Sequence, residues 1–127
     1  MIQAFNAAVA GLRVSAVRLG VAAENIVNVH SSGTLSPYDG YVPKRVVQTT
    51  SAHGLPVAGA QPVSNAFYPV YDPVDSRAGA DGLVGYPNVD LAANFVDLII
   101  AQRSYEASLV TIRTASEMMQ ALLDRTA

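Results

Sequence analysis

The sequence predicts a mainly α-helical chain in which two long terminal helices flank a small β-rich and turn-rich insert. Two observations support this fold class. At both ends of the 127-residue chain, apolar residues recur in alternating steps of three and four, which places them on one helix face. All seven prolines lie between these ends, where they exclude long helices. We expect the helices to form a coiled-coil-like layer, antiparallel or offset.

The N-terminal helix is predicted over residues 3–29, which contain no proline and only Gly11 and Gly20 as weak points. Its apolar stripe consists of Phe5, Val9, Leu12, Ala16, Leu19, Ala23 and Ile26. Its opposite face is apolar as well, with Val14, Val17 and Val21. A helix that is apolar nearly all round requires neighbours on several sides, in an assembly or at the centre of a small globule.

Residues 30–87 are expected to form the insert, because Ser-Gly, Asp-Gly and Pro-Tyr pairs mark frequent turns there. Residues 41–50 and 66–71 are rich in β-branched and aromatic side chains, which predicts a short strand in each. Lys44 and Arg45 would lie on alternate faces of the first strand. They either contact a partner or remain solvated charges at a strand edge.

The C-terminal helix is predicted within residues 88–127, with Asn88 or Asp90 as its N-cap and a pattern that persists to Asp124. Such a helix is about 55 Å long, whereas a compact globule of this chain length is only about 36 Å across. One subunit therefore cannot bury it. Its stripe comprises Leu91, Phe95, Leu98, Tyr105, Leu109, Ile112, Met119 and Leu123.

Two positions of the C-terminal stripe are polar, Gln102 and Ser116. They either fix the helix register or face a wetter part of an interface. Other apolar side chains lie away from the main stripes, and we expect neighbouring subunits to cover them with a gain on the order of 10 kcal/mol before ordering costs. These residues are Val14, Val17, Val21, Val96, Ile100 and Val110.

Composition argues against several classes of function. A net charge of −2 lacks the basic excess that nucleic-acid binding needs, and the absence of cysteine removes thiol chemistry and Cys-ligated zinc. His30 and His53 carry no catalytic signature, and the acidic residues of the insert lack the spacing of a calcium loop. We expect no enzyme activity, no cofactor and no metal. Arg13 and Arg18 interrupt the first apolar run, so neither a cleavable signal peptide nor a membrane span is expected.

Several motifs resemble those of bacterial flagellar basal-body rod proteins, most closely the FlgC family of proximal rod subunits. The N-terminal helix ends in Asn25-Ile26-Val27-Asn28, similar to the family's Asn-Ile-Ala-Asn. The C-terminal half matches more continuously, through Pro87-Asn88-Val89-Asp90-Leu91, residues 95–99, residues 101–107 and residues 114–119. In the insert, residues 41–47, Tyr71-Asp72-Pro73 and Ala80-Asp81-Gly82 also fit. Departures are Val27, Ser76-Arg77 and Leu83, where the family commonly has Ala, His-Pro and Tyr.

The resemblance implies a structural subunit of the periplasm-spanning rod, exported without cleavage through the flagellar type III apparatus. Its partners would be further copies in a helical tube and other rod proteins, with residues 1–29 and 88–127 as axial core and 30–87 as insert. Alternatives are another rod or hook-type subunit, or a soluble helical adaptor or export-chaperone-like binding module. The residues expected in subunit packing are Phe5, Leu12, Leu19, Ile26, Leu91, Phe95, Leu98, Tyr105, Leu109, Ile112 and Met119. Candidates for polar contacts between subunits are Lys44, Arg45, Gln102, Arg103 and Glu106.

Overall fold

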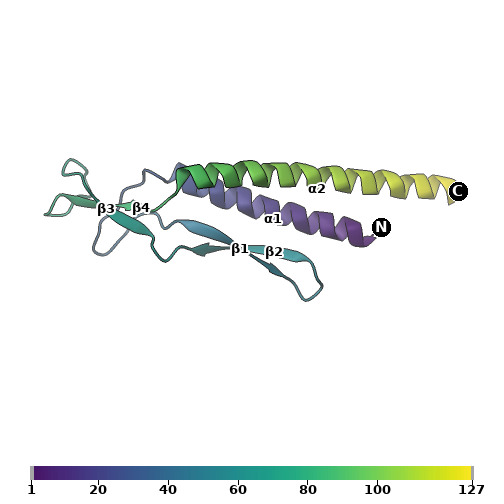
Figure 1. The fold of residues 1–127 in the computed structure, drawn as a ribbon, viewed down its shortest axis with the longest axis horizontal. Helices are drawn as coiled ribbons and strands as arrows, with labels where there is room; N and C mark the ends of the chain where they lie inside the picture. Colours follow the sequence, from purple (N-terminus) through teal and green to yellow (C-terminus); the bar gives the residue numbers. More distant parts are fainter. Residues whose placement is uncertain (1, 127) are drawn as a thin grey trace.

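The computed structural model describes residues 2–126 and confirms the predicted fold class. Two long antiparallel helices lie side by side, and both chain termini lie at the same end of the molecule (Figure 1). One β-hairpin runs along the N-terminal helix, and a second lies beyond the other end of the helix pair. The elements are α1 (Ile2–Val27), β1 (Lys44–Thr50), β2 (Pro56–Pro62), β3 (Phe67–Tyr71), β4 (Leu83–Pro87) and α2 (Leu91–Thr126).

The start of α2 agrees with the sequence. The Asp90 carboxylate accepts a hydrogen bond from the backbone N–H of Ala93 at 3.0 Å, so Asp90 is the N-cap. At 36 residues α2 is about 54 Å long, against about 39 Å for the 26-residue α1. The two helices are therefore offset, and α2 continues past the first residue of α1 at the end where both termini lie (Figure 1).

Two close approaches fix the register of the helices. The Asn25 side chain donates a hydrogen bond to the Asn94 side chain at 2.9 Å, and a Cβ added to Gly11 would lie 3.2 Å from the Ser108 hydroxyl oxygen. Both pairs have residue numbers that add up to 119, as expected for a continuous antiparallel register between the two helices.

Small side chains of α1 meet larger ones of α2 along this register. Ala8, Ser15 and Ala22 are buried at seven-residue intervals on α1. The register places Ile112, Tyr105 and Leu98 of α2 opposite them, at sums of 120. Ala101 and Ala115, also buried, alternate with these large residues along α2. The helices are held together mainly by this seam of small residues, and Gln102 and Ser116, predicted to lie in the seam, are exposed outside it.

The valine face of α1 is covered within the chain. Val14 and Val21 are each 8% exposed and Val17 is half-buried, and the β1–β2 hairpin contacts this side of the helix. The expectation that neighbouring subunits cover these three valines is therefore wrong, because the hairpin occupies that side. By contrast, Val96, Ile100 and Val110 of α2 are 50–64% exposed.

The sheets are two separate antiparallel hairpins, of which the sequence predicted only the first strands. Strand β2 begins and ends in proline and contains Gly59, and β4 contains Gly85, so neither shows the usual β-branched pattern. Strands β2 and β4 form because each pairs with the preceding strand, and not because their residues favour β-structure. At the far hairpin the rings of Tyr38 and Phe67 stack with centroids 4.1 Å apart.

Helix α1 is long and apolar enough to cross a membrane, with a mean hydropathy of 1.2 over its most apolar window. One such helix near the start of a chain is weak evidence for a span, because core helices and signal sequences share these properties. The described α1 packs against α2 on one side and the β1–β2 hairpin on another. The expectation that the chain does not span a membrane stays a prediction.

Candidate assembly site

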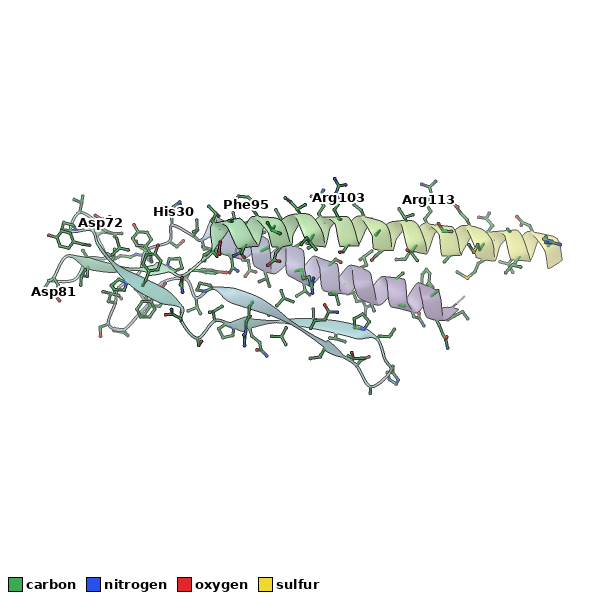
Figure 2. The ribbon with its side chains drawn as sticks, viewed as in Figure 1. His30, Asp72, Asp81, Phe95, Arg103 and Arg113 are labelled. Atoms are coloured by element: carbon green, nitrogen blue, oxygen red, sulfur yellow. The ribbon has the colours of Figure 1, made fainter. Side chains whose placement is uncertain are left out.

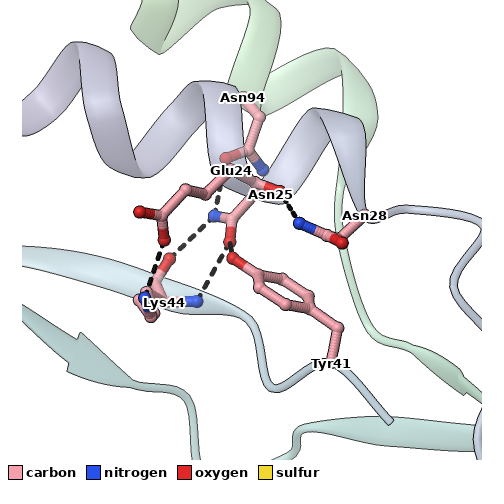
Figure 3. Close-up of polar contacts among 6 residues, drawn as sticks. All are labelled: Glu24, Asn25, Asn28, Tyr41, Lys44 and Asn94. Carbon is pink, nitrogen blue, oxygen red and sulfur yellow. Dashed lines mark hydrogen bonds and ion pairs between the residues drawn. The ribbon is translucent and has the colours of Figure 1, made fainter.

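Asn25 joins α1, α2 and the insert at one buried point (Figure 3). Its side chain, 4% exposed, donates to the Lys44 carbonyl at 2.8 Å and to the Asn94 side chain at 2.9 Å. Its oxygen accepts from the Lys44 N–H at 3.0 Å and the Tyr41 hydroxyl at 2.9 Å. These four bonds use both amide hydrogens and the carboxamide oxygen, so the buried amide is fully satisfied.

The Asn25 amide also acts as a substitute for a neighbouring strand. In β1 the N–H and C=O of Lys44 point away from β2, because the alternate residues, from Pro43 and Arg45 onward, carry the hydrogen bonds of the hairpin. The Asn25 carboxamide presents one acceptor and one donor to these two groups. The hairpin is thereby fixed to the helix pair at its first residue, where an open strand edge would otherwise remain.

Lys44 forms its ion pair within the chain. Its ammonium lies 2.7 Å from the Glu24 carboxylate, and this hydrogen bond, followed by the charge of Glu24, raises the pKa of the Lys44 side chain. Burial, followed by the Glu24 charge, raises the pKa of the Tyr41 hydroxyl, so this group remains a donor to Asn25 at neutral pH. Lys44 was a candidate for a contact between subunits; its side chain is paired with Glu24 but remains 42% exposed, so this contact stays a prediction.

The predicted packing residues fall into two groups. Leu98, Tyr105, Ile112 and Met119 are half-buried and lie at the spacing that faces α1. Six of the others lie about 40–60° around each helix from the nearest seam positions, since successive residues turn by about 100°. Leu91 lies seven residues before Leu98, only about 20° from it, and extends the seam face at the start of α2. In an antiparallel pair the six positions fall on the same flank, on the side away from the β1–β2 hairpin. We call this surface the apolar flank; it consists of Phe5, Leu12, Leu19, Ile26, Phe95 and Leu109, with Leu91 at its edge.

Much of the apolar flank is open to solvent in the single chain. Leu91, Phe95 and Leu109 are 39%, 46% and 46% exposed, and the α1 members are half-buried. Ile99 and Val96 widen the exposed apolar surface on the outer side of α2. Exposed apolar surface of this kind is typical of interaction sites.

Charged groups of α2 are exposed and paired along the helix. Arg103 pairs with Glu106 and Arg113 with Glu117, both at 3.0 Å, and Gln102 donates to Glu106 at 3.1 Å. The side chains of Arg103 and Arg113 project away from α1 (Figure 2). Exposed pairs of this type contribute little to the stability of the single chain, so their side chains remain accessible to a neighbour. Arg45 is likewise exposed.

No arrangement for chemistry is evident in residues 2–126. His30 and His53 are both exposed, and within this part of the chain no group of three His, Asp or Glu side chains lies close enough to hold a metal ion. The sequence interpretation missed Asn25 as a connecting residue. The sequence feature that could have identified Asn25 is its amide side chain in a largely apolar helix, at the first position of the Asn-Ile-x-Asn motif.

Comparison with known proteins defines the class of this helix pair. The family model described as "Flagellar basal body rod FlgEFG protein C-terminal" matches residues 80–125, which span β4, the Asp90 cap and nearly all of α2. The chain is thus related to flagellar basal-body rod proteins through the element that carries the exposed apolar residues.

Relatives that cover the whole fold identify the family. The chain is 34% identical to the flagellar basal-body rod protein FlgC of Salmonella typhimurium, over 94% of this chain and 92% of that protein. It is 32% identical to the FlgC protein of Agrobacterium fabrum, over 90% and 86%, and 26% identical to that of Bacillus subtilis, over 94% and 93%. The chain belongs to the FlgC family of flagellar basal-body rod proteins, as its motifs indicated. It is a structural subunit of the proximal rod.

Proposed function

We propose that copies of this chain assemble, with other rod proteins, into a helical tube that transmits torque across the periplasm. The observation that carries the proposal is the apolar flank, because the fold of the single chain uses other surfaces of both helices and leaves this one open. Heterologous contacts that do not close generate an open helical array. Many such contacts acting together can resist a twisting load that no single one would bear.

In this tube, residues 1–29 and 88–127 of each subunit form the axial core, and residues 30–87 form the insert. The Asn25 network supports this division, since it links the insert to both helices through four hydrogen bonds at one place. A load applied to the insert would pass into the helix pair through this connection rather than through a flexible hinge.

The subunit is exported through the flagellar type III apparatus and keeps its N-terminal helix. The fold supports retention, because α1 supplies one side of the helix seam, the valine face under the hairpin and Asn25 itself. Removing α1 as a signal segment would leave α2 and the hairpin without their common partner.

Leu109→Asp tests the proposal. A charge at a contact that becomes dry on assembly costs several kcal/mol, so we expect loss of the chain from purified basal bodies and loss of motility. Thr111→Asp is the matched control, because Thr111 is exposed about 180° away from the apolar flank on α2. Normal rods built from Leu109→Asp subunits would contradict the proposal. A wild-type chain that stays in the cytoplasm as a discrete dimer would instead favour the adaptor function.

A further inference from the structure

The β1–β2 hairpin is tied to α1 at one end only. Lys44 is bonded to Asn25, and the Gln48 side chain accepts a hydrogen bond from the Arg18 guanidinium at 2.8 Å. Beyond Gln48, no hydrogen bond or ion pair joins the hairpin to α1 within residues 2–126. The hairpin diverges from α1 toward its turn (Figure 1), so a groove opens between the two elements.

This groove has the size and the lining of a binding site. Its volume is about 450 Å³, within the range of about 300–1,000 Å³ that is usual for protein pockets, and its lining is mostly apolar. Val57 in its wall is 49% exposed, so the single chain does not fill the groove. We call this the hairpin groove; it is lined by Val9, Ala10, Val14 and Val17 of α1, by Leu55, Pro56, Val57 and Ala58 of the hairpin, and by Asn6, Arg13 and Ser51.

One charge determines which segments suit the hairpin groove. Arg13 is the only charged residue in its lining and makes no hydrogen bond or ion pair within residues 2–126. A guanidinium beside apolar walls is partly shielded from water, so a carboxylate that enters the groove binds it more strongly than it would at an open surface. The groove therefore suits an apolar segment that carries an Asp or Glu side chain.

The position of the groove excludes the chain's own segment of this chemistry. Residues 71–82 are acidic, and Val74 among them is 90% exposed. However, Asp72 and Asp81 lie at the end of the molecule opposite the termini (Figure 2), whereas the groove lies toward the termini (Figure 1). Copies packed side by side through the apolar flank keep these segments far from one another's grooves. The occupant is therefore a different protein.

We infer that the hairpin groove binds a short apolar and acidic segment of a different rod protein, with its apolar side chains against Leu55 and Val57 and its carboxylate on Arg13. This inference rests on the proposed function. The hairpin lies outside residues 80–125, which match the family model of FlgEFG proteins, so the groove adds a contact that is separate from helix α2. Such a contact discriminates between neighbours, because a segment without the carboxylate leaves Arg13 unpaired.

Photo-crosslinking in the assembled rod tests the inference. The photoreactive residue p-benzoylphenylalanine in place of Val57 should, on irradiation of purified basal bodies, join this chain to one different rod protein. Mass spectrometry of the joined peptide should find an Asp or Glu among apolar residues. The matched control carries the same photoreactive residue in place of Gln61, which is exposed on the same strand, about 14 Å from Val57, and does not line the groove. It should not join that peptide.

Substitutions at Arg13 supply an independent readout. In the Val57 crosslinking background, Arg13→Glu should lower the yield of the joined product about threefold, whereas Arg13→Lys should retain most of it because the charge is kept. Changing the acidic residue of the partner peptide to Arg should restore the yield with Arg13→Glu. Circular dichroism of the purified Arg13→Glu chain should match the wild type, since Arg13 has no polar partner within residues 2–126.

Several results would overturn the inference while leaving the rod function intact. One is a chain present in basal bodies that gives no joined product, or that joins only to other copies of itself. Others are a joined peptide without an acidic residue, equal joining from position 61, and a yield that Arg13→Glu leaves unchanged. Absence of the wild-type chain from basal bodies would overturn both proposals.

Discussion

At the scale of single residues, Asn25 connects both helices and the insert through its side-chain amide. Its amide replaces a β-strand partner for Lys44 and at the same time contacts Asn94 and Tyr41. Sequence reasoning recognised the motif that contains Asn25 but not its role, because its three partner residues lie at least 16 positions away in the chain. Such a role depends on the tertiary arrangement and has no periodic signal.

Replacing Asn25 should destabilise the whole chain. Asn25→Ala leaves the Lys44 N–H and C=O and the Tyr41 hydroxyl without partners, and each such loss costs about 1–3 kcal/mol when buried. We expect a fall of about 3 kcal/mol or more in the free energy of unfolding, measured by urea denaturation followed by circular dichroism. Tyr41→Phe, which removes a single bond, should cost about 1 kcal/mol.

The control for Asn25 is Asn28→Ala in the same motif. The Asn28 side chain donates only to the Glu24 carbonyl at the helix end and accepts from the Ser31 hydroxyl. Its loss should cost less than about 1 kcal/mol. Equal effects of the two substitutions would mean that Asn25 is not the connecting residue described here.

At the scale of elements, the sequence predicted both helices, the first strand of each hairpin, and Asn88 or Asp90 as the cap of α2, of which the structure selects Asp90. Heptad spacing and the absence of proline were sufficient for the helices. Large residues of the predicted α2 stripe, such as Leu98 and Tyr105, do face α1, but α1 meets them through small residues such as Ala8 and not through its own stripe. Periodicity shows which residues share a helix face. Which face packs against the other helix depends on how closely the two backbones can approach. Strand β2 was missed because pairing overrides its two prolines.

The small-residue seam predicts opposite effects at two glycines of α1. Gly11→Leu should lower the free energy of unfolding by about 1–3 kcal/mol through overpacking, because even a Cβ would lie 3.2 Å from the Ser108 hydroxyl. Gly20→Leu, with no atom within 4 Å of its Cβ position, should raise it by up to about 1 kcal/mol through helix propensity. Thermal unfolding of both variants measures the difference. A stabilising Gly11→Leu would show that the helices are not in close contact there.

At the scale of the whole molecule, the surfaces that hold the single chain together differ from the surface that we propose for assembly. The seam, the valine face and the Asn25 network hold the single chain, whereas the apolar flank and the long outer side of α2 stay exposed. The expected length of α2, too great for one subunit to bury, is the sequence argument that the structure supports most directly. The sequence could not assign the valine face to the hairpin, because that contact lies between segments about 40 residues apart.

Association of the purified chain should be driven by apolar surface. We expect sedimentation velocity to show larger species as concentration rises, and more of them in sodium sulfate, which strengthens apolar burial. Leu109→Asp should shift the chain toward monomer under the same conditions. Association that instead weakens steeply with added salt would indicate that charged pairs such as Arg103–Glu106 dominate the contact.

The separation of the seam from the apolar flank also bears on genetics. A subunit damaged only on its flank keeps its seam, so it would be synthesised, survive proteolysis and enter the export queue alongside intact copies. One defective copy at a growing end could block every later addition. Flank alleles should therefore be dominant over the wild-type gene in a merodiploid, whereas seam alleles, whose products are degraded before export, should be recessive.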